Sequence, residues 1–95
     1  MATTETLEHL EELLLKDLLE CYKKSLEDIP IWEYRWFFSN CSFSLFSAVQ
    51  RVFRDPTKIN TINLLDALTQ NDCEMMEQYG IGDPQHRVVA RMLLV

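Results

Sequence analysis

The feature that most constrains the fold is the scarcity of residues that interrupt helices. The chain of 95 residues has only two glycines and three prolines. A fold built from many short strands needs more turn residues than this, so the scarcity favours helical segments. Hydrophobic residues make up 47% of the chain, which predicts an ordered domain. Because single domains typically have about 100–150 residues, we expect one domain over residues 1–95.

Apolar residues in the first part of the chain recur at steps of three or four: Leu7, Leu10, Leu14, Leu18 and Cys21. This spacing predicts a helix over residues 4–27. Further leucines within residues 13–19 widen the stripe, so we expect neighbours on more than one side of the helix. Two shorter helices that separate near Lys16 are the alternative. In either case, residues 1–16 are an N-terminal extension or part of the first helix, and residues 17–95 form the rest of the domain.

Residues 28–40, DIPIWEYRWFFSN, hold five of the ten aromatic residues. Proline is tolerated in the first turn of a helix, so a second helix is expected to begin here. One of its faces is predicted to be the core face: Ile31, Tyr34, Phe38 and Cys41. Trp32 and Trp36 lie four residues apart on roughly the opposite side. These two tryptophans are candidate anchors for a protein partner, because tryptophan is favoured at binding hot spots.

Further helices are predicted from the spacing of apolar residues and from end signals. Residues 43–54 form one, with Leu45, Phe46, Val49, Val52 and Phe53 inward. A short helix on Ile62, Leu65 and Leu68 is capped by Asn60 or Thr61, and the next helix is capped within residues 69–72 and ends at Gly80. Asp83 and Pro84 begin the last helix, which directs its apolar side chains inward: Val88, Val89, Met92 and Leu93. The predicted fold class is therefore all-α, a compact bundle of five to six helices.

Charge changes sign along the chain, whose net charge is −6. Residues 1–20 carry −5, residues 21–60 carry +2 and residues 61–95 carry −3. An acidic chain is poorly suited to nucleic acid or to an anionic membrane, both of which bind basic surfaces. We therefore expect neither as a partner. With no leader sequence and no apolar run of about 20 residues, a cytoplasmic location is expected.

No arrangement of residues predicts catalysis. Cys21, Cys41 and Cys73 lack zinc-binding spacing and are expected to be reduced thiols. His9 and His86 are expected to be solvated surface residues. Phosphate-binding loops and known catalytic motifs are absent from the sequence. We expect no enzymatic activity, no cofactor and no metal.

Three segments in order resemble the pyrin domain, a member of the death-fold superfamily. The first comprises Leu26, Ile31, Tyr34, Arg35, Trp36 and Phe38, which are similar to the signature of its first and second helices. The second is residues 64–80, in which the likeness is carried by Leu64 or Leu65, Ala67, Asp72, Met76, Tyr79 and Gly80. The third, HRVVARMLL, is similar to its fifth helix, so the resemblance extends over roughly residues 18–95.

This resemblance implies a death-fold bundle of antiparallel helices in Greek-key order. A long unbroken first helix would count against it. It also implies homotypic association in inflammasome signalling, a part of innate immunity, through two oppositely charged faces. The acidic face would comprise Asp17, Glu20, Glu27, Asp72, Glu74 and Glu77. The basic face would comprise Arg35, Arg51, Arg54 and Lys58.

A different helical protein remains an alternative. It would be a viral or host regulator or inhibitor whose apolar surface binds a partner or a second copy. The excess of apolar residues in residues 13–19 and 92–95 would form that surface. Salt distinguishes the two hypotheses, because charge-driven association weakens as salt rises.

Overall fold

The computed structural model of the chain is all-α, as the sequence predicts, and contains no strand in the part that it describes. It describes residues 3–93, and the side chains of residues 9–88 and 90–92. Six α-helices and one 3-10 helix follow one another: α1 Thr3–Ser25, α2 Trp32–Asn40, α3 Phe43–Arg54, η1 Pro56–Thr61, α4 Leu64–Ala67, α5 Gln70–Tyr79 and α6 Pro84–Leu93.

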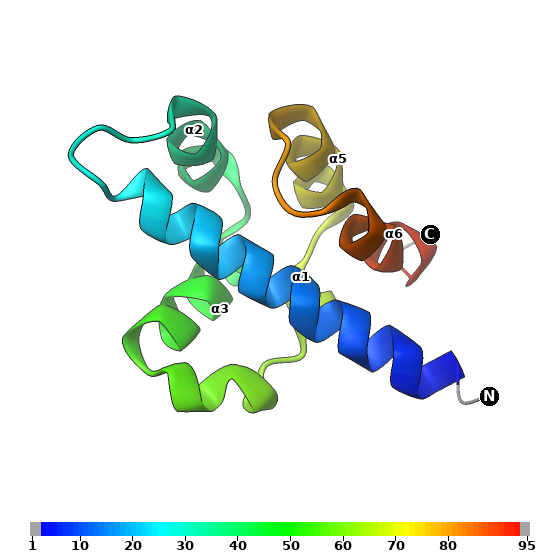
Figure 1. Ribbon diagram of the computed structural model, residues 1–95. Coiled ribbons are helices and arrows are strands. Elements are labelled where there is room, and N and C mark those ends of the chain that lie inside the picture. Colours follow the sequence, from blue (N-terminus) through cyan, green and yellow to red (C-terminus); the bar gives the residue numbers. More distant parts are fainter. Residues whose placement is uncertain (1–2, 94–95) are drawn as a thin grey trace.

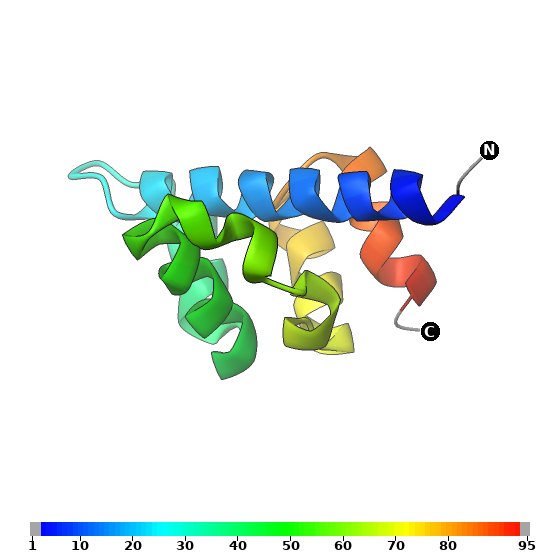
Figure 2. The same cartoon turned by 90° about the horizontal axis from the view of Figure 1, so that it is seen from below.

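Helix α1 is the longest helix of the structure and contacts most of the others. It is one continuous helix of 23 residues, so the interpretation as two shorter helices is wrong. It packs against α2, α3, η1, α4 and α6, which confirms that its wide apolar stripe is covered on several sides. In Figures 1 and 2, α1 lies across the other helices along the whole length of the molecule. A long first helix that crosses its neighbours is the feature that counts against the antiparallel death-fold arrangement.

The leucines of α1 fill the core instead of forming a free surface. Leu14, Leu15 and Leu18 are fully buried together with Phe37 of α2 and Leu45 of α3. Burial of a leucine side chain contributes roughly 1.5–3 kcal/mol, so this cluster is a main source of stability. The apolar surface that the alternative hypothesis places over residues 13–19 is therefore used inside the molecule.

Helix α2 keeps most of the predicted core face: Phe38 is buried, and Tyr34 and Cys41 are partly buried and pack against the core. Ile31 is the N-cap residue in an extended conformation, and it is 39% exposed rather than buried. Its carbonyl accepts hydrogen bonds from the N–H groups of Tyr34 and Arg35, which sets the phase of the first turn. Phe37 and Phe38 are the buried residues of α2. Phe37 is a core residue that the sequence pattern did not identify.

The predicted helix over residues 43–54 is confirmed. The Ser42 hydroxyl caps it by accepting a hydrogen bond from the Leu45 N–H. Phe53, predicted to be inward, is instead 40% exposed and packs edge-on against Tyr22. A capping box of Thr69 and Asp72 begins α5, and Gly80, in a left-handed conformation, ends it as predicted.

The segment between α3 and α5 differs from the prediction. Neither Asn60 nor Thr61 caps a helix there; both lie in η1, and the Thr61 hydroxyl donates to the Lys58 carbonyl. The short helix α4 begins only at Leu64, after the N-cap residue Asn63.

Helix α6 begins at Pro84, and the preceding Asp83 side chain caps it by accepting a hydrogen bond from the Gln85 N–H. Its inward face was predicted incorrectly, since Ala90 is buried whereas Val88 and Met92 are 38% and 63% exposed. The small Ala90 side chain allows α6 to approach the helices that it packs against. The predicted inward side chains of Val89 and Leu93 lie outside the described residues.

The three cysteines are free thiols. Cys21 and Cys73 are buried and Cys41 is half-buried, so all three side chains pack within the fold. Burial raises the pKa of all three thiols, and that of Cys41 reaches about 11, with the nearby Asp72 carboxylate adding to the effect.

Candidate protein-interaction surface

Asp72, predicted for the acidic face, is fully buried and has a structural role. Its carboxylate accepts hydrogen bonds from the Ser42 N–H at 2.7 Å, from the Ser42 hydroxyl and from the Thr69 N–H at 3.0 Å. These bonds join the beginning of α3 to the beginning of α5. Asp72 is therefore not available to a partner, and its inclusion in the acidic face was wrong.

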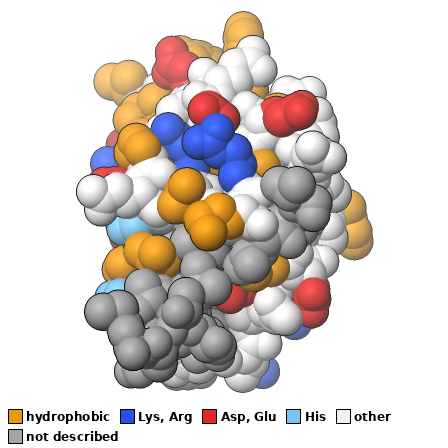
Figure 3. Space-filling view, turned by 90° about the vertical axis from the view of Figure 1, so that its right-hand side faces the viewer, with side chains coloured by type: hydrophobic (Ala, Val, Ile, Leu, Met, Phe, Trp, Pro, Cys, Tyr) orange, Lys and Arg blue, Asp and Glu red, His pale blue; other side chains and the backbone are white. Residues whose placement is uncertain are grey.

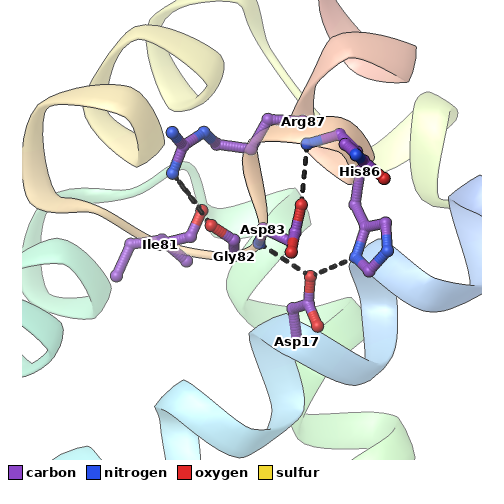
Figure 4. A network of polar contacts seen from close by, with 7 residues as sticks. Asp17, Ile81, Gly82, Asp83, His86 and Arg87 are labelled. Atoms are coloured by element: carbon purple, nitrogen blue, oxygen red, sulfur yellow. Dashed lines mark hydrogen bonds and ion pairs between the residues drawn. The ribbon is translucent and has the colours of Figure 1, made fainter.

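Asp17 is also used within the molecule. One of its carboxylate oxygens accepts a hydrogen bond from the Asp83 N–H at 3.0 Å and lies 2.6 Å from His86 Nδ1 (Figure 4). Arg87 extends the network by donating to the carbonyls of Ile81 and Gly82. The side chain of His86 is only 18% exposed, so it is not the solvated residue that the sequence suggested. This network fixes the turn between α5 and α6 onto α1.

The remaining acidic candidates are exposed, but two of them have partners. Glu20 lies 3.4 Å from Lys23, and Glu77 lies 3.3 Å from Arg91. On the end of the molecule that carries α6 and the N-terminus of α1, acidic, basic and hydrophobic side chains are intermixed (Figure 3). Within the described part of the chain, only Glu27 and Glu74 of the predicted acidic set are exposed and without a salt bridge.

Three of the four predicted basic residues come together. Arg51, Arg54 and Lys58, all exposed, line a hollow of about 350 Å³ between α3 and η1. Its other lining residues are Ser47, Gln50 and Asp55. The Thr57 hydroxyl and N–H hold the pKa of the Asp55 carboxyl below its usual value, so this residue is a charged part of the rim. With two arginines, one lysine and one aspartate, the hollow carries a net positive charge.

The fourth basic residue, Arg35, lies elsewhere, on the outer face of α2. Its guanidinium stands 5.2 Å from the ring centroid of Trp32, in cation–π geometry. Its Nε donates a hydrogen bond to the carbonyl of Ser25, at the end of α1. Trp32 and Trp36 are 57% and 58% exposed. Folding therefore leaves both tryptophans exposed, with an arginine held against the first of them.

Further apolar side chains are exposed just before these tryptophans. Leu26, Ile29 and Ile31 are 53%, 89% and 39% exposed, and they lie in the connection between α1 and α2. We name residues 26–31 the hook. The sequence reasoning did not identify the hook as a surface element, although one signal was available, since Ile29 precedes a proline and is therefore pushed out of the helical conformation.

A larger hollow, of about 640 Å³, lies between α1 and the segment of η1 and α4, lined by His9, Glu11 and Glu12 among others. The Glu11 carboxylate has a partner within the molecule, because it accepts a hydrogen bond from the Leu65 N–H at 3.2 Å. Over the residues that the structure describes, no three His, Cys, Asp or Glu side chains are grouped to hold a metal ion. None of the described helices is both long and apolar enough to cross a membrane.

No protein-family model, no curated protein and no solved structure matches this chain.

Proposed function

We propose that this chain is a non-enzymatic protein–protein interaction module. The observation that carries the proposal is the outer face of α2, where Trp32 and Trp36 are both more than half exposed and Arg35 is held over the Trp32 ring. Tryptophan and arginine are the residues most enriched at binding hot spots. Two exposed tryptophans four residues apart on one helix form a contiguous apolar patch, which marks an interaction surface more strongly than a single exposed aromatic residue does.

The proposal includes homotypic association of the pyrin type, in the cytosol and in innate-immune signalling. Its support is the resemblance in sequence together with the gathering of Arg51, Arg54 and Lys58 around one hollow. Charges of this kind steer association and select partners more than they add affinity. The acidic side of such a contact would rely on Glu27 and Glu74, because the other four acidic candidates have partners within the molecule.

The test replaces both tryptophans with alanine. Hot-spot truncations cost about 2 kcal/mol or more, so we expect binding to weaken by a factor of roughly 30 or more. Capture of protein by the immobilised chain from cell extract and sedimentation velocity of the chain alone both report on binding. The matched control is Phe43→Ala, which removes another aromatic side chain, 84% exposed, from outside this surface. If the double variant associates as the wild type does in both measurements, the proposed interaction surface is wrong.

A further inference from the structure

The hook is an apolar tip flanked by acidic side chains. Ile29 is 89% exposed, and the two residues before it, Glu27 and Asp28, are both exposed. Neither carboxylate forms a salt bridge with any residue whose side chain is described. The connection that carries them projects beyond the end of α1 in both views (Figures 1 and 2). A partner that suits this tip offers room for an aliphatic side chain and a positively charged rim.

The hook is held in place by hydrogen bonds at its base. The Ser25 hydroxyl donates to the Tyr22 carbonyl at 2.6 Å, and the Leu26 N–H donates to the Lys23 carbonyl at 3.1 Å. Arg35 ties the start of α2 to the end of α1 through the Ser25 carbonyl. A segment ordered in this way loses less conformational entropy on binding than a flexible loop.

The hollow between α3 and η1 carries the charge opposite to that of the hook. Its rim carries Arg51, Arg54 and Lys58, and no salt bridge joins these cations to a carboxylate among the described side chains. A volume of about 350 Å³ leaves room for one side chain. All six lining residues are polar or charged, so an aliphatic side chain there would contact the aliphatic stems of the two arginines and the lysine. The same chain therefore carries an acidic apolar projection and a basic recess.

The hook and the hollow border the same end of the molecule. Tyr22, whose carbonyl supports the base of the hook, accepts a hydrogen bond from Gln50 of the hollow at 3.3 Å through its hydroxyl. The described hydrogen bonds and ion pairs include none between the hook and the hollow of the one chain. Each is thus open to a second molecule.

We propose that the hook of one copy of this chain inserts into the α3–η1 hollow of a second copy. Ile29 enters the recess, and Glu27 and Asp28 face its cationic rim. This inference rests on the proposed function and specifies its partner as the chain itself. Most homo-oligomers are symmetric, and in a two-fold dimer the hook of each copy would meet the hollow of the other. The acidic residues of the hook make an anionic membrane an unsuitable occupant.

A charge exchange tests the contact. The first variant, Glu27→Lys with Asp28→Lys, has a basic hook and a basic hollow. The second, Arg51→Glu with Arg54→Glu, has an acidic hook and an acidic hollow. All four side chains are exposed, so we expect both variants to fold, as checked by circular dichroism.

Sedimentation velocity at low salt should detect concentration-dependent association of the wild type. Each variant alone should associate at least about tenfold more weakly, because like charges then face each other across the contact. An equimolar mixture of the two variants should recover association, since each hook then meets a hollow of opposite charge. Ile29→Ser should also weaken association, whereas the control Phe43→Ser, at a site of similar exposure, should not.

A wild type that stays monomeric, an oligomer that persists in either variant, or a mixture that shows no recovery would overturn the proposal. None of these results would overturn the interaction surface at Trp32 and Trp36, which is tested separately. A wild type that stays monomeric would remove self-association from the proposed function and leave binding to a different protein. A chain that does not self-associate but loses captured protein when the tryptophans are replaced retains the interaction surface and loses self-association.

Discussion

Replacement of Asp72 by alanine should destabilise the protein strongly, although the residue was first expected on the surface. The carboxylate is fully buried and accepts three hydrogen bonds, two from Ser42 and one from Thr69. Alanine would leave these donors without their acceptor at the beginnings of both α3 and α5. Each such bond contributes a net amount of about 1 kcal/mol, so we expect a loss of about 3 kcal/mol.

This loss is large relative to the total free energy of unfolding of the domain. A chain of this length has a free energy of unfolding of roughly 5–14 kcal/mol. A loss of about 3 kcal/mol corresponds to a fall in Tm of roughly 12–24 °C for a domain of this size. Asp72→Asn retains one acceptor oxygen, so we expect it to lose about half as much as the alanine variant.

Urea unfolding followed by circular dichroism and tryptophan fluorescence measures the effect. Glu74→Ala is the matched control, because Glu74 is an exposed carboxylate on the same helix and should change stability by no more than about 0.5 kcal/mol. If Asp72→Ala lowers the free energy of unfolding by less than about 1 kcal/mol, the hydrogen bonds of the Asp72 carboxylate do not hold α3 and α5 together.

Two further predictions concern the backbone and pH. Gly80→Ala and Gly82→Ala both place a side chain at positive φ, which costs roughly 1–2 kcal/mol of stability. At Gly82 the new Cβ would also lie only 3.1 Å from Leu14 Cδ1, so crowding adds to the cost there. Urea unfolding should therefore show the larger loss for Gly82→Ala, by about 1–3 kcal/mol, and equal losses would contradict the crowding. The second concerns Cys41, whose pKa of about 11 in the folded protein lies above its ordinary value of 9.0. Between these values the unfolded thiol has lost its proton and the folded thiol has not, so stability falls as pH rises. The urea midpoint should fall more between pH 9.0 and about 11 in the wild type than in Cys41→Ala.

Local signals in the sequence predicted the local structure well. Thr69, Asp72 and Gly80 define the two ends of α5 through hydrogen bonds within a few residues, and the structure has both ends as predicted. The capping of α6 by Asp83 follows the same logic. Such interactions depend only on neighbours in the chain, so a sequence pattern is sufficient to identify them.

Contacts between distant residues were the ones missed. Asp72 meets Ser42 across 30 residues of sequence, and Asp17 meets His86 across 69. Charge and position along the chain do not distinguish an aspartate that bonds to a distant helix from one that is solvated. The same limit applies to α2, where the apolar spacing placed Ile31 on the core face, whereas the structure leaves it 39% exposed and buries Phe37.

These missed contacts change which charges are available for association. The acidic, basic and acidic segments of the sequence suggested two broad opposed faces. Folding uses Asp17 and Asp72 internally, and Glu20 and Glu77 lie beside Lys23 and Arg91. The basic cluster around the α3–η1 hollow keeps all three of its cations exposed. A charge-driven contact then needs carboxylates that the fold leaves without partners, and Glu27, beside the exposed Ile29, is one of them. Of the predicted acidic residues, those that stay exposed and without a salt bridge in the described part of the chain are therefore Glu27 and Glu74, and the predicted basic face reduces to the hollow and Arg35.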